Sequence, residues 1–253
     1  MKAEVGMLIA VCGAAIGSFL NVCIYRLPRT GLSPLFPVFS FCPKCQNPIK
    51  IRDNVPLISF LLLKGRCRSC AAKISPSYLM VELLGGFLAV ITVLFFGFSL
   101  AALWLFFFFA VLIVIAGIDW EHMVIPDSLS LGGMAVSLIC APIAMKTPFS
   151  TSIIGALAGG SAIIGINFIY KKTTGREGFG FGDAKLLAFI GAALGWQALV
   201  WIIFLSSFCG AIVGIAFLAK HGLRQEIPFA PFLAFAAIIY PFCQPFLWKM
   251  LRF

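Results

Sequence analysis

Charged residues are scarce in this chain: they make up 11% of its 253 residues, whereas 61% of the residues are apolar. That balance excludes a soluble globular domain. The chain has only two histidines, His122 and His221, which is too few for a histidine-rich metal site. It also lacks a Gly-Lys-Ser/Thr sequence after the glycines of residues 155–165, so those glycines do not form a phosphate-binding loop.

The chain consists largely of long apolar runs. A helix of about 20 apolar residues crosses the ~30 Å hydrocarbon core of a membrane. From such runs we predict an all-α polytopic membrane protein with about eight transmembrane helices. The runs cover residues 6–24, 78–96, 101–118, 129–144, 153–170, 186–196 and 199–218, and a last one ends near residue 248. No small-residue cleavage site follows the first run, so we expect it to be retained.

Basic residues are unevenly distributed along the chain, whose formal net charge is +10. Residues 25–77 hold nine Lys and Arg but a single acid, Asp53. Basic loops beside membrane spans face the cytoplasm, which predicts that this segment is inside and both termini are outside. A nucleic-acid-binding loop is the alternative. Topology and contact with anionic lipid are commoner causes of such charge, so we expect no nucleic-acid partner.

Two Cys-x-x-Cys pairs lie in this basic segment. Their spacing is typical of a zinc ribbon, in which four thiolates surround one zinc ion. Disulfides are the alternative, but the cytoplasm is reducing. We therefore predict a small cytoplasmic zinc-binding domain at residues 25–77, with zinc in a structural role. The predicted ligands are Cys42, Cys45, Cys67 and Cys70.

Two aspartates lie where an apolar run meets a polar loop. Asp119 ends the third run, and Asp183 follows the sequence Gly-Phe-Gly-Phe-Gly at residues 178–182. If the spans alternate, both carboxyls lie at the same membrane face, where an ionisable group is a functional-site candidate. Two adjacent carboxyls share one proton, so that one acts as a base and the other as an acid. Such a pair can activate a water molecule against a peptide bond.

Structural roles compete with this interpretation. Asp183 alone has the pattern of a helix N-cap after a flexible loop, and Asp127, which follows Pro126, has it too. The pairing of Asp183 with Asp119 favours a functional role. The glycines before Asp183 also allow backbone conformations closed to other residues and the close approach of a substrate strand.

Taken together, these motifs resemble the bacterial prepilin peptidases, or type IV leader peptidases, which are membrane aspartic peptidases with a Gly-x-Gly-Asp motif. The resemblance covers nearly the whole chain in ordered blocks. They lie at residues 17–22, 25–28, 42–45, 53–59, 67–70, 74–75, 81–83, 118–119, 125–127, 180–186, 191–196 and 227–229. Departures are few: Ser77 replaces the usual arginine, Leu79 a common proline and Ala230 a common glycine.

The resemblance implies that Asp119 and Asp183 form the catalytic dyad, with Gly180, Gly182 and Lys185 in the catalytic loop. It implies a bacterial inner-membrane enzyme that cuts the short basic leader from type IV prepilins and pseudopilins, the subunits of pili and of type II secretion, on the cytoplasmic side. Many members also methylate the new N-terminal amine with S-adenosylmethionine. No glycine-rich nucleotide motif marks a site for that cofactor here.

A basic leader approaching a basic protein face needs acidic contacts. The acids expected near that face are Glu82, Glu121, Asp127 and Glu177. Of these acids, Glu82 is the one we most expect to bind the leader, because burial near hydrocarbon strengthens a charge pair.

The sequence predicts three parts of the chain: a first span at residues 1–24, the cysteine-rich domain at 25–77 and a membrane-embedded peptidase domain at 78–253. The sequence leaves the oligomeric state open.

Two other functions fit some of these features. A proton-coupled transporter would use Asp119 and Asp183 as a relay, but its acids would lie near the membrane midplane on broken helices in related halves. Here the acids lie at the ends of spans, and no internal repeat is visible. A zinc-loop scaffold of a secretion complex, with inert aspartates, is the third interpretation.

Overall fold

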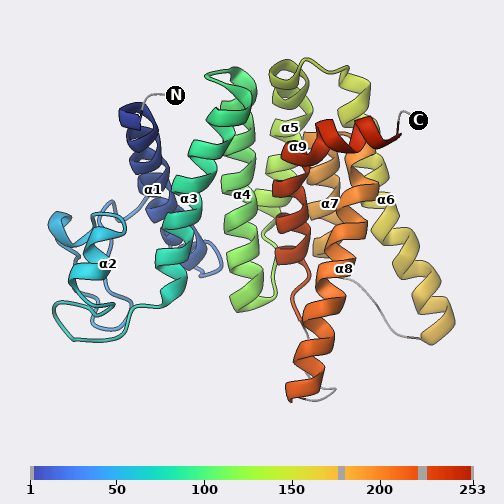
Figure 1. The fold of residues 1–253 in the computed structure, drawn as a ribbon. Coiled ribbons are helices and arrows are strands. Elements are labelled where there is room, and N and C mark those ends of the chain that lie inside the picture. The colour runs from blue at the N-terminus through green and yellow to red at the C-terminus, as the bar shows by residue number, and fades with distance from the viewer. Residues whose placement is uncertain (1–2, 176–179, 222–226, 252–253) are drawn as a thin grey trace. The chain divides into compact units, whose positions relative to one another are not determined.

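The structure is a computed structural model that describes residues 3–175, 180–221 and 227–251, and it is dominated by helices (Figure 1). The helices are α1 (Ala3–Arg26), α2 (Ile58–Leu62), α3 (Pro76–Phe96), α4 (Leu100–His122), α5 (Asp127–Met145), α6 (Phe149–Thr174), α7 (Phe181–Leu194), α8 (Trp196–His221) and α9 (Ala230–Leu251), with a 3₁₀ turn η1 at Ile51–Asp53. Within the described residues no strand forms, only two isolated β-bridges. The predicted all-α class is therefore confirmed.

Seven of the described helices are long and apolar enough to cross a membrane: α1, α3, α4, α5, α6, α8 and α9. The predicted span at residues 186–196 corresponds to α7, which has only 14 residues. At 1.5 Å per residue α7 is about 21 Å long, shorter than the ~30 Å hydrocarbon core. It ends because Gly195 takes a left-handed backbone conformation, with φ of 87°, before α8 begins.

The chain forms two compact units, residues 1–106 and 107–253. The predicted domain boundary at residue 78 does not coincide with the boundary between these units, because α3 packs against α1 in the first unit. Glycines allow the two backbones to meet: a Cβ on Gly13 would clash with Gly85, and one on Gly17 would clash with the backbone of Val81 and Glu82. Small residues at such crossings let helices pack closely in lipid.

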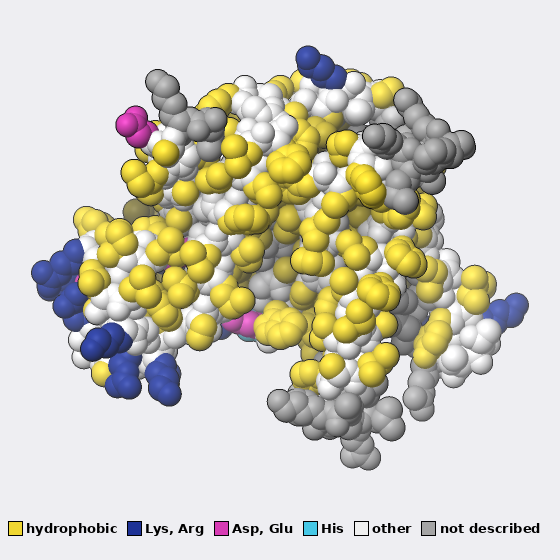
Figure 2. All heavy atoms as spheres, in the orientation of Figure 1, with side chains coloured by type: hydrophobic (Ala, Val, Ile, Leu, Met, Phe, Trp, Pro, Cys, Tyr) yellow, Lys and Arg dark blue, Asp and Glu magenta, His cyan; other side chains and the backbone are white. Residues whose placement is uncertain are grey.

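The segment between α1 and α3 is organised around Arg26, which is buried. Its guanidinium donates hydrogen bonds to the backbone carbonyls of Ser33, Pro37 and Phe39, and it lies over the ring of Phe41. Figure 2 shows Lys and Arg side chains gathered on this segment, whereas hydrophobic side chains cover the helices on the face drawn. A buried arginine therefore holds together a segment in which large apolar side chains, such as Phe36, Val38 and Phe39, are exposed.

In the second unit, α7 is the central helix: Leu186, Leu187, Phe189 and Ile190 are completely buried. Its neighbours are mainly α5 and α6. The backbones of α6 and α7 touch at Gly155 and Gly191, where an added Cβ on either residue would overlap the other glycine's carbonyl. A helix too short to span the membrane is thus held by packing on every side.

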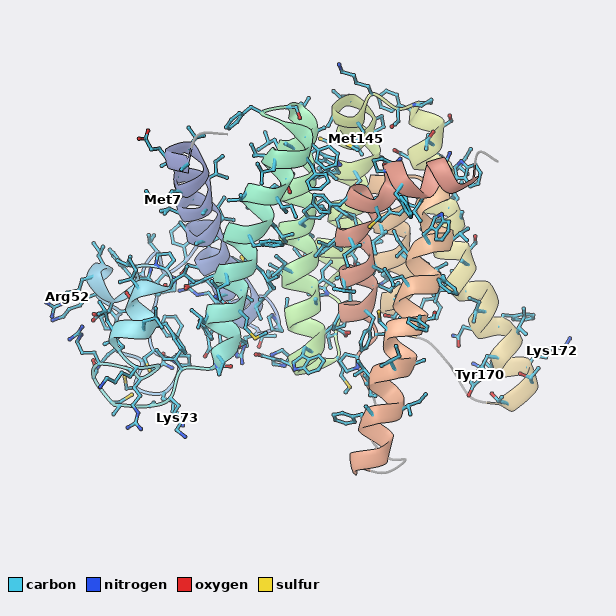
Figure 3. The ribbon with its side chains drawn as sticks, in the orientation of Figure 1. Met7, Arg52, Lys73, Met145, Tyr170 and Lys172 are labelled. Atoms are coloured by element: carbon cyan, nitrogen blue, oxygen red, sulfur yellow. The ribbon has the colours of Figure 1, made fainter. Side chains whose placement is uncertain are left out.

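The start of α5 and the end of α6 lie toward the same end of the second unit. Met145, at one end of α5, and Lys172, at the far end of α6, are labelled at opposite ends of this helix pair in Figure 3. Since α6 runs back along α5, α5 begins near the level at which α6 ends. The α4–α5 loop and the start of α7 lie at the same end of the second unit, since Gly182 packs on Ile125.

We expect Gly155→Ala to destabilise the second unit by about 1–3 kcal/mol, because the new methyl group would force α6 away from α7. Thermal unfolding of the protein in detergent measures this loss. Gly165→Ala is the matched control, because a Cβ at this position in the same helix has nothing within 4 Å. An equal loss of stability in both variants would contradict the packing explanation.

Candidate active site and metal site

Asp119 lies near the end of α4 and is buried, with 6% of its surface exposed. Its Oδ2 accepts a hydrogen bond of 3.1 Å from the backbone N–H of Ala230, the first residue of α9. The first amides of a helix have no partner within the helix, and the helix dipole makes that end favourable for an anion. The start of α9 therefore holds Asp119 in position and favours its ionised form.

Asp183 lies in the first turn of α7 and is half-buried. The residue that precedes the helix is Gly180, so Asp183 is not the N-cap of α7. Gly182 packs directly on Ile125: an added Cβ would lie 3.2 Å from that side chain. The close contact brings the start of α7 against the loop that follows α4.

The carboxyls of Asp119 and Asp183 are near enough for the charge of Asp119 to act on Asp183. Burial and the nearby charge of Asp119 raise the pKa of the Asp183 carboxyl to about 6, which disfavours simultaneous ionisation of the two carboxyls. The hydrogen bond from Ala230 favours the negative charge on Asp119, and Asp183 has no such contact with Ala230. The structure thus brings together the two aspartates that the sequence singled out.

Lys185 and Asp127 form an ion pair, with 2.6 Å between Nζ and Oδ1. The pair joins the second turn of α7 to the start of α5. Asp127 is the first residue of α5, after the N-cap Pro126, so the interpretation of Asp127 as an N-cap is wrong. Pro126 has no side-chain donor or acceptor, and Asp127 uses its carboxylate across the helices. Because the pair is partly exposed, it positions α7 more than it stabilises the fold.

Two of the remaining predicted acids lie in different units: Glu121 is in the second and Glu82 in the first. Glu121 is exposed, and its Oε2 lies 3.9 Å from His122 Nε2. Glu82 lies in the first unit and is considered below. Glu177, Gly178 and Phe179 are outside the residues that the structure describes. The contact of Asp119 with the amide of Ala230 could not be predicted from the sequence, because every residue except proline has a backbone N–H.

Four thiols gather in the first unit as predicted. The Sγ atoms of Cys42, Cys45, Cys67 and Cys70 all lie within 4.8 Å of one another, and those of Cys42 and Cys70 are 3.9 Å apart. Zinc bonds of about 2.3 Å in a tetrahedron place sulfurs about 3.8 Å apart, so the cluster matches a tetrahedral metal shell. The four-thiolate donor set suits zinc better than a hard cation.

The two halves of the cluster have the same backbone design. In each, the residue after the second cysteine has a left-handed conformation, at Gln46 with φ of 58° and at Ala71 with φ of 55°. The N–H of each of these residues bonds the carbonyl of the first cysteine of its pair. The N–H of Cys70 also lowers the pKa of the Cys67 thiol to about 7. Thiolate, the form that binds metal, is therefore favoured at Cys67, whereas its neighbours raise the pKa of the Cys70 thiol to about 11.

Long apolar helices with two neighbouring carboxyls at helix ends are the features of a class: this is a membrane aspartic peptidase. The family models agree with that class. The bacterial peptidase A24 N-terminal domain matches residues 11–96, and the type IV leader peptidase family matches residues 106–215.

Curated relatives resemble the chain over most of its length. Proteins named prepilin leader peptidase/N-methyltransferase are 39% identical in Aeromonas salmonicida, over 92% of this chain and 88% of the relative, and 35% identical in Pseudomonas aeruginosa, over 90% and 86%. A Klebsiella pneumoniae protein of the same name is 39% identical over 80% of this chain and 90% of its own length. No solved structure matches. The chain belongs to the type IV leader peptidase family.

We expect the purified protein to carry about one zinc ion per chain and Cys67→Ser to lose it, because three thiolates no longer complete the tetrahedron. Elemental analysis of the protein by mass spectrometry measures the content. Cys140→Ser is the control, since that cysteine lies on α5, away from the cluster. Zinc retained by the Cys67 variant, or absent from the wild type, would contradict the assignment.

Proposed function

We propose that this protein removes the leader from type IV prepilins and pseudopilins at the bacterial inner membrane and methylates the N-terminus that cleavage creates. The observation that carries the peptidase is the placement of the two aspartates: Asp119 is held by the Ala230 N–H, and Asp183 lies on a helix start that packs against the loop after α4. The names of the relatives support both activities. Because these relatives are named prepilin leader peptidases, prepilins are the proposed substrates. The seven apolar helices support the membrane location.

The contacts of the pair assign a role to each aspartate. Asp119, ionised and fixed by Ala230, removes a proton from water as the water oxygen attacks the scissile carbonyl carbon. Asp183, protonated, donates a hydrogen bond to the carbonyl oxygen and stabilises the negative charge that develops there. When the tetrahedral intermediate collapses, the proton held by Asp119 passes to the leaving amine. Gly180 and Gly182 give the substrate backbone room to approach.

Charge supports an orientation with the active site and the cysteine-rich segment facing the cytoplasm. The segment between α1 and α3 and the last turn of α6, with Lys171 and Lys172, are basic, and such loops stay inside. Exposed Glu121 is available near the catalytic pair for the basic leader. Leader binding by Asp127 competes with its ion pair to Lys185. Leader binding by Glu82 remains a prediction.

Zinc and S-adenosylmethionine are the proposed cofactors. Zinc would be held by Cys42, Cys45, Cys67 and Cys70, where it cross-links two stretches of the cytoplasmic segment and supports its fold. Hydrolysis needs no metal in this scheme because both proton transfers are made by carboxyls. S-adenosylmethionine would supply the methyl group that the N-methyltransferase relatives require.

A proton-coupled transporter receives no support from the comparisons, all of which concern peptidases of this family. Asp119 and Asp183 are also near helix ends, in the last turns of α4 and the first turn of α7, rather than at the centres of broken spans.

We expect Asp119→Asn and Asp183→Asn each to lower leader cleavage by roughly 10²–10⁴-fold, because either change removes one half of the acid–base pair. The assay follows the shortening of a prepilin by purified protein, with the cut position read by mass spectrometry. Asp127→Asn, which removes an exposed carboxylate nearby, should lower cleavage by no more than about tenfold. Appreciable turnover by either dyad variant would remove that aspartate from the dyad.

The role of the Ala230 amide has its own test. Ala230→Pro removes the N–H that bonds Asp119, while proline is tolerated at the first residue of a helix. We expect cleavage to fall by about 10–100-fold, the loss of one hydrogen bond to a charged group. Ala230→Gly keeps the N–H and should stay within about threefold of the wild type. Equal activities of the two variants would show that the amide does not act on Asp119.

A further inference from the structure

Large apolar side chains are exposed at two places on the cysteine-rich segment between α1 and α3. The first place is a tip at residues 35–39, where four side chains are between 64% and 77% exposed: Leu35, Phe36, Val38 and Phe39. The second is the α2 face, formed by the exposed side chains of Ile58, Leu61 and Leu62. Clustered apolar side chains outside the membrane spans mark a surface that contacts something other than water.

The tip is bonded to the end of a membrane span. Arg26 is the last residue of α1, and its guanidinium donates hydrogen bonds to the carbonyls of Pro37 and Phe39, at 2.8 and 3.1 Å. With 24 residues, α1 is about 36 Å long, so it crosses the ~30 Å hydrocarbon core and ends at its edge. The tip therefore lies within one side-chain length of the membrane edge, at the level of the lipid headgroups.

The start of α2 is bonded to a second span. The N–H of Leu57, the residue before α2, donates a hydrogen bond of 2.7 Å to Oε2 of the buried Glu82. Glu82 lies six residues after Pro76, the first residue of α3, which is about 9 Å along the helix axis. Because the 21 residues of α3 match the hydrocarbon thickness, Pro76 lies near the membrane edge. The start of α2 thus lies beside the membrane-embedded part of α3.

A cavity in the first unit shows the same arrangement. Ser18 and Val22 of α1 and Glu82 of α3 line one side of it, and the cysteine-rich segment lines the other. Ser18 lies eight residues before Arg26, or about 12 Å along α1. In Figure 1 the segment lies beside α1 and α3, and in Figure 2 hydrophobic side chains continue from the helices onto it. The segment therefore packs alongside the spans.

The charges of the segment suit the edge of a membrane. Residues 25–77 hold nine Lys and Arg, and their one acid, Asp53, is paired with Arg68. Figure 2 shows Lys and Arg side chains at the outer and lower edges of the segment. Such side chains lay their apolar stems on lipid and direct their charges to the headgroups. Neither residues 35–39 nor residues 58–62 include a charged residue, so inserting them into lipid buries no charge.

We propose that the cysteine-rich segment is an interfacial domain whose tip and α2 face insert among the lipids beside α1 and α3. Its partner is the phospholipid bilayer. Apolar residues with basic residues around them are the usual form of such an anchor. The two anchors hold the four thiols at a fixed height at the membrane surface, so the segment does not move freely in the water phase. This placement goes beyond the activities proposed above and does not depend on them.

Photo-crosslinking tests the contact with lipid. The full chain is placed in nanodiscs of phosphatidylethanolamine and phosphatidylglycerol, with p-benzoylphenylalanine, which attacks nearby C–H bonds under ultraviolet light, at one position. Phe36 and Leu61 are the test positions. Lys73 is the control position, because it is exposed on the same segment and points away from the helices in Figure 3. We expect lipid adducts, counted by mass spectrometry, to be about fivefold more frequent at Phe36 and Leu61 than at Lys73.

A second measurement uses the unaltered protein, in which no probe perturbs the fold. Hydroxyl radicals oxidise the side chains that water reaches. In the same nanodiscs, Phe36, Phe39 and Leu61 should be oxidised about fivefold more slowly than in free peptides of the same sequence, because lipid covers them. Peptide mass spectrometry gives both rates. Without lipid cover, the exposure of these side chains predicts oxidation close to the peptide rate.

Every outcome supports or overturns the proposal. Equally frequent lipid adducts at Phe36, Leu61 and Lys73, or oxidation of Phe36 and Leu61 at the peptide rate, would show that the segment stands clear of the bilayer. Adducts with another protein or with a second copy of the chain would assign the two surfaces to a protein interface and overturn it as well. Gel filtration identifies any probe variant that misfolds, and oxidation of the unaltered protein then decides.

Discussion

One buried hydrogen bond, from the N–H of Ala230 to Asp119, joins the last turns of α4 to the first residue of α9. A carboxylate at the edge of a membrane is unfavourable unless something satisfies its charge. The start of a helix satisfies it with an amide that has no other partner, without adding a positive side chain. The amide therefore lowers the cost of a negative charge on Asp119 beside a second carboxyl, as the proposed acid–base chemistry requires.

The second carboxyl depends on how α7 is packed. This helix is too short to span the membrane, and its side chains are almost completely buried between neighbours. Glycine contacts set its depth and rotation: Gly191 meets Gly155 in α6, and Gly182 meets Ile125. Rigid contacts of this kind hold Asp183 opposite Asp119 more precisely than a loop would, and the Lys185–Asp127 ion pair adds a lateral restraint.

The chain separates its chemistry between its two compact units. The aspartates belong to the second, and the four thiols and the cavity beside Glu82 belong to the first. The proposed hydrolysis and methyl transfer make opposite demands, since hydrolysis needs a water molecule beside a carboxyl pair whereas methyl transfer needs a site that shields a reactive donor from water.

The sequence by itself determined the fold class and singled out the two aspartates and the four clustered thiols. Carboxyls at the ends of apolar runs and paired Cys-x-x-Cys sequences stand out because these residue types are costly or reactive wherever they occur. Only the tertiary structure decided that Ala230 holds Asp119, that Asp127 pairs with Lys185, that α3 packs with α1, and that Glu82 lines a cavity. Each of these depends on backbone groups or on segments far apart in the chain. Their contacts follow from how the helices pack, which residue type alone does not record.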